Sequence, residues 1–420
     1  MRRERKLLGR MGCAHPRRIL CAAVLAVAAL VSSNTRLSAS PTPAAQEYFV
    51  YVGTYTHGAS KGIYLYRFDE RTGRLSSLGL AAEMANPSFV VASPNHRFLY
   101  ALSEMPNGSA KDRRGDGPAL GSISGFAINP RTGALTFLDR ASSGGVGPAH
   151  LGMDKTGRIL FVANYGSGSI ASYAIFPDGR IGAMTGFNQH RGHSINPQRQ
   201  SWPHAHEAVV SPGNRFLYTP DLGLDRIFIY RINLARRTFT PNNPAHAAVR
   251  PGLGPRHIAF APNGKFAYVV CEMGSAVVAF AFHRQTGALT PIQTISTLPA
   301  GYSGFNGAAE IHIDKSGRFL YVSNRGVNNI VEFQIDESTG RLKPVQSIST
   351  QGEFPRNFVI DPTGRYLLAA NQNSNTIVVF KIDAANGHLT PTGQSLPAGA
   401  PVCLQFVPEA RVVTVFHGAR

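Results

Sequence analysis

Two charged residues, Arg256 and Glu272, lie near the opposite ends of one short segment, GPRHIAFAPNGKFAYVVCEMGS (254–275). The segment reads as two apolar strands joined by a tight turn at APNG, so the two ends of this hairpin should meet in space. A guanidinium there can bind an anion, and the neighbouring carboxylate can take a proton from water. This pair is therefore our first candidate for a chemical site.

The hairpin that carries the pair is one of a series. Its turn and apolar strands recur in five other segments, whose basic turn residues are spaced 47 to 61 residues apart. A period of that size built only from strands and turns predicts the blades of a β-propeller, with one four-stranded sheet in each period. The six copies occupy residues 93–104, 154–165, 211–222, 261–272, 314–325 and 361–372.

A second turn type gives an independent blade count. It occurs seven times, at 69–75, 129–135, 176–181, 233–240, 283–289, 336–342 and 383–389. The missing seventh inner strand is APVCLQF near the C-terminus, and its partner is YFVYVGTYT (48–56) near the N-terminus. Pairing them closes the ring and removes exposed sheet edges. We therefore predict an all-β, seven-bladed β-propeller over residues 46–420, in which RVVTVF (411–416) is not explained by the blade count.

Positions where the repeats differ and carry charge are the best candidates for function. Aligning the copies on their basic turn residue brings two columns to one face of the disc. The first column holds Ser88, Ala149, His206, Arg256, Ala309 and Arg356. The second holds Glu104, Tyr165, Leu222, Glu272, Arg325 and Gln372.

These columns predict a charged cluster at the mouth of a central channel. Its members are His206, Arg256, Arg356, Glu272 and Arg325, with His257 and Asn357 beside them. Unpaired burial of charge is costly, so the cluster needs partners or a ligand. One interpretation is an ion-pair ring that only joins the blades. The other is a site whose excess of arginine is completed by an anionic ligand, since arginine suits bidentate capture of carboxylate or phosphate.

Further candidates lie close to these columns. His204 and His206 in PHAH occupy one strand face and could hold a metal, but no acidic or histidine partner has metal spacing, so we predict no metal. Glu310 is expected near the mouth, and His312 fits a packed core imidazole as well as a ligand. The long insertion at 190–206 predicts a lid or pocket wall. Cys271 is expected to be a buried apolar residue rather than a nucleophile.

The first 45 residues are typical of an export signal followed by a spacer. A basic stretch precedes ILCAAVLAVAALV (19–31) and a Ser/Ala/Pro-rich segment, and the apolar run is short for a membrane span. An uncleaved N-terminal anchor is the alternative. We expect a periplasmic or extracellular protein, or a cytoplasmic one if this interpretation is wrong, and no stable membrane span after signal removal.

Net charge narrows the class of partner. The formal charge is +18, of which residues 1–36 carry +7, so +11 remains without that segment. The remaining basic residues are scattered rather than grouped in runs. This distribution argues against nucleic acid and favours small anionic ligands. The sequence does not predict an oligomeric state.

Several motifs together resemble one known family. They are YVGTYT, the TGRL turns, NPQRQ with PHAH, DLGLDRI, GPRHIAF, AEIHID, FLYVSNRG and FPRNFVIDPTGRYLLAANQNS, spread from Tyr48 to Phe406. This ordered set is similar to the bacterial 6-phosphogluconolactonase/carboxymuconate cyclase family of seven-bladed propeller lactonases. The resemblance implies hydrolysis of 6-phosphoglucono-1,5-lactone, or lactonisation of carboxymuconate in the fungal branch. By motif match it also implies a site at His206, Arg256, Glu272 and Arg325.

The resulting hypothesis is a lactonase that needs no metal or organic cofactor and acts on a sugar-acid lactone. Its catalytic residues would be His206, Glu272 and Arg256, with either Glu272 or His206 as the general base. The substrate-binding residues would be Arg325, Arg356, His204, His257, Asn357 and Glu310. A carboxymuconate cyclase and a non-catalytic extracytoplasmic ligand-binding propeller are the alternatives. Because phosphogluconolactone is cytosolic, an exported enzyme would act on another lactone or sugar acid.

Overall fold

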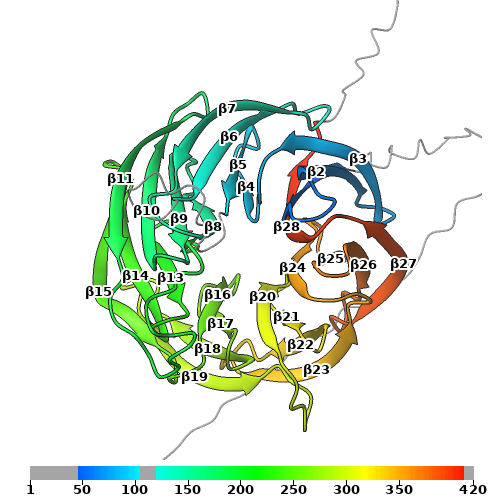
Figure 1. Ribbon diagram of the computed structural model, residues 1–420. Helices are drawn as coiled ribbons and strands as arrows, with labels where there is room; N and C mark the ends of the chain where they lie inside the picture. Colours follow the sequence, from blue (N-terminus) through cyan, green and yellow to red (C-terminus); the bar gives the residue numbers. More distant parts are fainter. Residues whose placement is uncertain (1–45, 105–119, 411–420) are drawn as a thin grey trace, which may run out of the picture. The chain divides into compact units, whose positions relative to one another are not determined.

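The computed structural model describes residues 46–104 and 120–410. These residues form seven four-stranded antiparallel sheets arranged as blades around a central channel (Figure 1). No helix occurs in this part of the chain, and therefore no helix that could cross a membrane. The predicted all-β, seven-bladed propeller is confirmed. The expected export signal at 1–45 and the segment 411–416 lie outside the described residues.

In each blade the first strand lies beside the channel and the fourth lies at the outer rim. The first blade contains β28 (Pro401–Pro408), β1 (Glu47–Thr54), β2 (Gly62–Asp69) and β3 (Arg74–Glu83). The second blade contains β4 (Val90–Ala92), β5 (Phe98–Ser103), β6 (Ser122–Ile128) and β7 (Leu135–Ser142). The third contains β8 (Pro148–Met153), β9 (Ile159–Asn164), β10 (Ser169–Ile175) and β11 (Ile181–Gln189). The fourth contains β12 (Val209–Val210), β13 (Phe216–Asp221), β14 (Arg226–Asn233) and β15 (Thr238–Ala248). The fifth blade contains β16 (Pro255–Phe260), β17 (Phe266–Cys271), β18 (Ala276–Phe282) and β19 (Leu289–Ser296). The sixth contains β20 (Gly307–Ile313), β21 (Phe319–Arg325), β22 (Asn329–Ile335) and β23 (Leu342–Ser349). The seventh contains β24 (Pro355–Ile360), β25 (Tyr366–Asn371), β26 (Thr376–Ile382) and β27 (Leu389–Pro397).

The hydrophobic core lies between neighbouring blades. The second strands carry the apolar runs of the repeat, and every residue of β5, β9, β13, β17, β21 and β25 is buried. The outermost strands bury only part of their residues, as β7 and β19 show. Continuous apolar strands therefore form the inside of the ring wall, and mixed strands form its outer surface.

The recurring TG turns join one blade to the next. The Tyr51 hydroxyl donates to the carbonyl of Gly133 in the next blade at 2.7 Å. Gly133 has φ of +71°, and a Cβ there would lie 2.7 Å from the side chain of Leu65. Only glycine fits both the left-handed conformation and the close approach. The turn is therefore a scaffold feature, which explains why it recurs.

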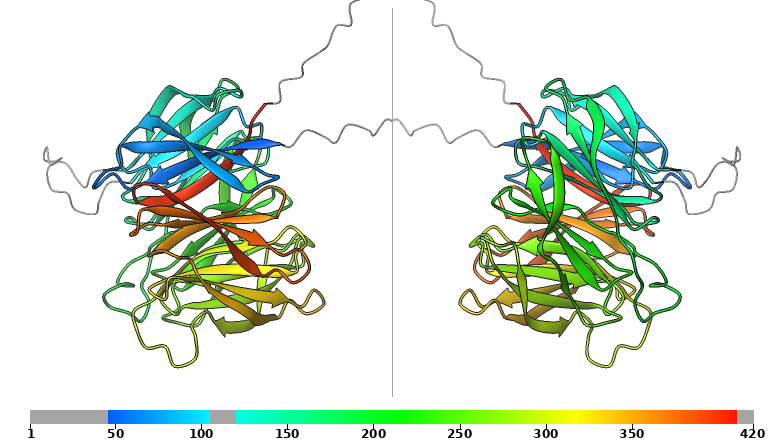
Figure 2. Two further views of the ribbon diagram at one scale, coloured as in Figure 1. Left: turned by 90° about the vertical axis from the view of Figure 1, so that its right-hand side faces the viewer. Right: turned by 90° about the vertical axis from the view of Figure 1, so that its left-hand side faces the viewer.

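The ring is closed within one blade by the two ends of the described chain. β28 pairs with β1 in antiparallel register from Tyr48↔Pro408 to Thr54↔Pro401. Figure 2 shows the red C-terminal strand lying beside the blue N-terminal strand. Arg67 adds a two-pronged ion pair to Glu409, with N–O distances of 2.9 and 3.0 Å. The closure inferred from the two turn counts is confirmed.

Inner strands carry an irregularity where they begin. In β16 the register passes from Pro255↔Cys271 to His257↔Val270, so Arg256 is an extra residue in the strand. The same shift makes Ala149 and Arg356 extra residues in β8 and β24. Such a bulge interrupts the alternation of a strand and re-aims a side chain. Here it lies at the column singled out from the sequence.

Candidate active site

A carboxylate surrounded by arginines forms the centre of the mouth. Glu272, which follows β17, is bound by Arg199 through Oε1 at 2.8 Å. Its Oε2 lies 2.7 Å from Arg325 Nη2 and 3.3 Å from Arg256 Nε. The predicted contact between the two ends of the 254–275 hairpin is therefore present, and Arg325 joins it from the next blade.

Electrostatics fix the charge of this carboxylate. Burial disfavours the ionised form of Glu272, but the charges of Arg325 and Arg256 outweigh it and hold the pKa of its carboxyl well below the ordinary value. For Arg256, the effect of burial outweighs that of the opposite charges nearby. Burial, together with the like charges of Arg325 and Arg356, lowers the pKa of its guanidinium to about 9. The mouth thus contains one firmly ionised acid within a surplus of positive charge.

Among the arginines of the mouth cluster, Arg356 is the one that forms no ion pair with a described residue. Its guanidinium lies 5.6 Å from the ring centroid of Tyr55, within the range of a cation–π contact. The Tyr55 hydroxyl in turn donates to Glu104 Oε2 at 2.9 Å. The charge of Glu272 is therefore balanced by ion pairs within the protein, whereas the charge of Arg356 is not and is available to an anionic ligand.

His206 is buried beside this positive charge. Its ring lies 5.5 Å from that of Tyr165 and 5.1 Å from that of His257. Burial, together with the charge of Arg256, lowers the pKa of the His206 imidazole well below its ordinary value. Its Nδ1 is buried without a hydrogen-bond partner in the described part of the chain. A neutral imidazole with an unoccupied nitrogen can accept a proton.

His204 contacts the same tyrosine as His206. Its ring stacks on Tyr165 at 4.3 Å, and its Nδ1 lies 3.0 Å from the Tyr165 carbonyl oxygen. This contact occupies one ring nitrogen of His204. Over residues 46–104 and 120–410, no group of three or more His, Cys, Asp or Glu side chains is arranged to hold a metal ion.

The insertion at 190–206 is a fixed wall of the site rather than a loose lid. Asp221 accepts a hydrogen bond from the His204 backbone N–H and contacts His190 Nδ1 at 2.6 Å, so it holds both ends of the insertion. Asp225 accepts from Ser194 Oγ at 2.6 Å and from Gln200 Nε2 at 2.8 Å. These bonds position Arg199, whose role the sequence columns missed because the insertion has no counterpart in other blades.

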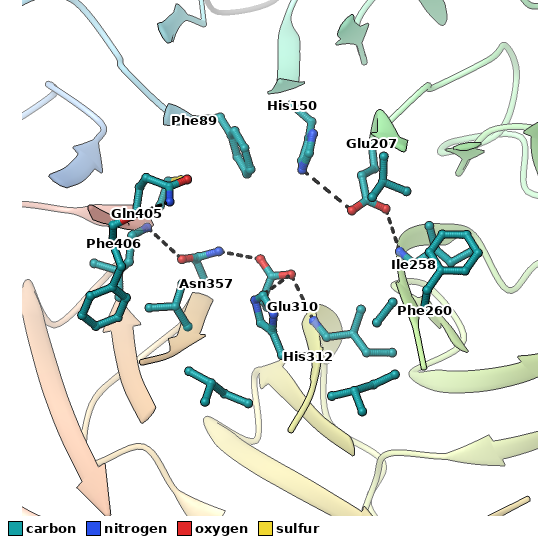
Figure 3. A pocket seen from close by; sticks show the side chains of 18 of the residues that line it. Phe89, His150, Glu207, Ile258, Phe260, Glu310, His312, Asn357, Gln405 and Phe406 are labelled. Carbon is teal, nitrogen blue, oxygen red and sulfur yellow. Dashed lines mark hydrogen bonds and ion pairs between the residues drawn. The ribbon is translucent and has the colours of Figure 1, made fainter. Parts of the chain in front are cut away.

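A second group of polar residues lies deeper in the channel. His257 Nδ1 contacts Glu310 Oε1 at 2.9 Å, and Asn357 Nδ2 donates to Glu310 Oε2. Figure 3 shows Asn357 and Glu310 facing the channel together with His150 and Glu207. The structure thus divides the predicted site residues into two groups. Arg256, Glu272, Arg325, Arg356, His204 and His206 surround the mouth, whereas His257, Glu310 and Asn357 belong to the deeper group.

His150 and Glu207 are two polar channel residues that the sequence columns missed. They lie one position after the aligned column of Ala149 and His206, where Phe89, His257, Glu310 and Asn357 also fall. Shifting the alignment by one residue would have found the group.

Two expectations need correction. Glu310, expected near the mouth, lines the deeper cavity with His312 and Phe406, because it lies one residue further along β20 than the mouth column. The packed-core interpretation of His312 is wrong, since 40% of its side chain is exposed and it lines the same cavity. Cys271, in contrast, is buried as expected, and burial raises the pKa of its thiol.

The fold and this geometry define a class: a seven-bladed propeller with an arginine-rich cluster at one end of its channel. A protein-family model described as "Lactonase, 7-bladed beta-propeller" matches residues 49–406. The chain belongs to this lactonase family. The family resemblance drawn from the sequence is therefore confirmed.

Individual relatives agree with the family assignment. The 6-phosphogluconolactonase of Bacillus subtilis (strain 168) is 33% identical over 313 residues, covering 74% of this chain and 85% of the relative. That of Formosa agariphila is 34% identical over 315 residues, covering 74% and 86%. The structure of a periplasmic gluconolactonase from Pseudomonas aeruginosa superposes with a TM-score of 0.80 at 37% identity, covering 87% of this chain and all of that one. These relatives are named as lactonases, which are carboxylic-ester hydrolases.

Proposed function

We propose that the mouth cluster hydrolyses the internal ester of a sugar-acid lactone. The observation that carries this proposal is the buried His206 imidazole, with an unoccupied Nδ1, beside a cluster of excess positive charge. A neutral base can activate water, and fixed guanidinium groups can stabilise the negative oxygen that forms on the carbonyl. The family membership and the names of the relatives support the same activity.

The proposed reaction begins when His206 takes a proton from water. The water oxygen bonds to the lactone carbonyl carbon, and the carbonyl π electrons move onto its oxygen, giving a tetrahedral oxyanion. Arg256 is the guanidinium assigned to this oxyanion, because it is buried next to His257 and close to His206. When the carbonyl re-forms, the bond from carbon to the ring oxygen breaks. The ring oxygen takes the proton from His206, which releases an open-chain hydroxy acid.

Glu272 is assigned a positioning role rather than that of the base. Both of its oxygens are occupied by arginines, so neither is free to take a proton from water. It holds Arg256 and Arg325 close together against their mutual repulsion. Of the two bases considered from the sequence, the geometry favours His206.

Arg356 and Arg325 are proposed to bind the anionic or polar end of the substrate, with His204 forming part of the pocket wall. Arg356 has the strongest claim, because among the mouth arginines its guanidinium is the one that forms no ion pair with a described residue. His257, Glu310 and Asn357 are placed behind the reacting groups. In this proposal they support Arg256 rather than touch the lactone ring.

We also propose that the protein is exported and acts on an unphosphorylated lactone. The basic and apolar N-terminal segment supports export, and the similar Pseudomonas aeruginosa structure is that of a periplasmic gluconolactonase. Determining the mature N-terminus in the native host tests the location. The carboxymuconate cyclase and the non-catalytic propeller gain no support from the names of these relatives.

A turnover screen of purified protein on sugar lactones, phosphorylated and unphosphorylated, tests the proposed activity. Arg356→Ala should raise KM more for an anionic lactone than for a neutral one, by about tenfold for the loss of one charge-assisted contact. Arg131→Ala, an exposed arginine on an outer turn, is the matched control. Equal turnover of every lactone with and without protein would overturn the proposal.

A further inference from the structure

The channel contains a second cavity, separate from the mouth cluster. It has a volume of about 480 Å³, within the range of small-molecule sites, and is lined by residues of the inner strands and the segments next to them. Glu272, Arg256, Arg325 and Arg356 are not among its lining residues. Phe260, Ile313 and Ile360, which end β16, β20 and β24, do line it, so the cavity faces the channel end opposite the mouth.

The polar floor of this cavity is a chain of bonded groups. Asn357 Oδ1 accepts from the Leu404 N–H at 2.9 Å, and Asn357 Nδ2 donates to Glu310. On the other side, Glu207 Oε2 accepts from the Ile258 N–H at 2.6 Å. Figure 3 shows Asn357, Glu310, Glu207 and His150 around one open space. Backbone and side-chain partners hold these groups in place before any ligand arrives.

Two buried polar side chains, His150 and Glu207, form a long ion pair beside this space. His150 Nδ1 accepts from the Ala208 N–H at 3.4 Å, which leaves a proton on Nε2 of the neutral ring. That Nε2 lies 3.8 Å from Glu207 Oε1, beyond hydrogen-bond distance. His150 and Glu207 are 8% and 6% exposed. Because their contact is longer than a hydrogen bond, a ligand in the cavity can bond to the His150 donor and to the Glu207 carboxyl oxygen.

The charge of the cavity differs from that of the mouth. None of the described residues lining it is Lys or Arg. The Glu310 carboxylate already receives donors from His257, Asn357 and the Ile311 N–H, so its charge is satisfied within the protein. Burial raises the pKa of the Glu207 carboxyl and lowers that of the His150 imidazole, which favours the uncharged form of each. An anion therefore finds no counter-charge here.

The walls are apolar and aromatic. Phe89 packs on the His150 ring with centroids 3.9 Å apart, and Phe260 and Phe406 line the same space. The 40% exposed His312 side chain shows that solvent reaches the cavity. Uncharged donors and acceptors on a fixed floor, between apolar walls, match a ligand that carries hydroxyl groups on a compact carbon ring.

We propose that this cavity is a binding site for an uncharged polyhydroxylated ligand the size of a single sugar ring. None of the mouth residues Arg256, Glu272, Arg325 and Arg356 lines this cavity, although Glu310 and Asn357, which support Arg256 in the lactonase proposal, form part of its floor. Its ligand carries no charge because its described lining contains no Lys or Arg, whereas the mouth is rich in arginine. Each end of the channel would then accept a different kind of molecule.

Calorimetric or NMR titration of the full chain with D-glucose and with methyl glucoside tests the proposal. The wild-type protein and His206→Ala should bind both saturably, while gluconate and tetramethylammonium should not compete. Glu207→Leu removes the buried carboxyl, and Ile313→Trp fills the open end of the cavity. Each should weaken binding by about tenfold or more, the equivalent of one or two lost hydrogen bonds.

Glu207→Leu also leaves the Ile258 N–H without a partner and can unfold the protein. Ile313→Trp keeps the backbone pairing of β20 with β21. Its sugar binding therefore tests the proposal even if Glu207→Leu fails to fold. Ile292→Trp, on the outer strand β19, is the matched control and should bind as the wild type does. No saturable binding of either sugar, binding unchanged in Ile313→Trp, or preferential binding of tetramethylammonium would each overturn the proposal.

Discussion

Two buried titratable side chains at the mouth respond in opposite ways to the same surroundings. The charges of Arg325 and Arg256 keep Glu272 ionised, whereas burial, together with the charge of Arg256, keeps His206 neutral. One environment thereby separates the two roles. Glu272 holds the arginines together, and His206 remains free to accept a proton. Environments that move two pKa values apart are a common basis for assigning roles in an active site.

Glu272→Gln should destabilise the fold and not only reduce turnover. It removes the counter-charge of buried Arg256 and Arg325, and breaking a buried pair by removing one partner costs about 3–5 kcal/mol. Denaturant unfolding at pH 7 measures the difference. Because the folded-state pKa of Glu272 is depressed, its contribution is present above its unfolded value and is lost as pH falls below that value.

The stability gap between the wild type and Glu272→Gln should therefore narrow progressively as the pH is lowered below about 4.5. A gap that stays constant down to strongly acidic pH would show that the charge of Glu272 does not carry the effect. Glu337→Gln, an exposed acid on an outer turn, is the control and should leave the stability unchanged at neutral pH.

The sequence predicted the mouth residues better than those deeper in the channel. Arg256 and Glu272 could be paired because an antiparallel hairpin brings its ends together, whatever the rest of the fold does. Arg199 could not be found in this way, since it comes from an insertion without an equivalent in other blades. Glu207 and His150 were missed because the bulged strand starts place two successive residues toward the channel, which an alignment of single columns does not show.

At the scale of the strand, the bulges allow one inner strand to serve two sites. Arg256 is the extra residue in β16, and its Nη1 lies 3.4 Å from the ring of the next residue, His257. Neighbours in a regular strand would point to opposite faces. Because of the bulge, Arg256 reaches Glu272 at the mouth while His257 reaches Glu310 in the channel. The inner-strand starts are therefore the elements that build the site.

The wall formed by residues 190–206 gives a prediction at the same scale. Asp225→Asn keeps the size and tolerates the φ of +53° at this position, but replaces one acceptor oxygen by a donor. At least one of the bonds from Ser194, Gln200 and the Gly252 N–H should be lost. Faster amide hydrogen exchange across 193–202, with a higher KM, is expected because Arg199 is less well positioned.

Asp178→Asn, on an exposed turn of another blade, is the control for this measurement. Exchange across 193–202 that matches the wild type in Asp225→Asn would contradict the description of the insertion as a wall held by Asp225.

At the scale of the whole molecule, the blades are held together by a repeated tyrosine bond. Tyr321 donates to the Gly387 carbonyl of the next blade at 2.6 Å, as Tyr51 and Tyr100 do to theirs. Tyr268 occupies the equivalent strand position, but its hydroxyl is buried without a partner among the described residues. The chain thus contains its own matched pair for measuring this bond.

Tyr321→Phe should lower the free energy of unfolding by about 1–3 kcal/mol, because it leaves a buried carbonyl without its donor. Tyr268→Phe should be neutral or slightly stabilising, since it removes an unsatisfied hydroxyl. Denaturant unfolding of the two variants checks this. Equal destabilisation by both substitutions would show that the inter-blade bond does not contribute.

The architecture of the ring could be predicted almost entirely from the sequence. The TG turns require glycine for conformational and steric reasons, so they repeat visibly and count the blades. The closure of the ring could be predicted because the sequence has seven outer turns but only six inner hairpins. The seventh inner pair therefore had to combine strands from the two ends of the chain. The depth of the channel and its cavity could not be predicted, since they depend on how closely side chains from all seven blades approach one another.

The central claim, that a neutral His206 serves as the base of a lactonase, is tested most directly by one rate. The initial rate of hydrolysis of glucono-1,5-lactone is measured for the wild type, His206→Ala and His193→Ala, and the spontaneous rate is subtracted. His193 is an exposed histidine on the same insertion. We expect His206→Ala to lose about 10²–10⁴-fold in kcat, as for a missing general base, with His193→Ala unchanged. A folded His206→Ala with the wild-type rate would contradict the claim.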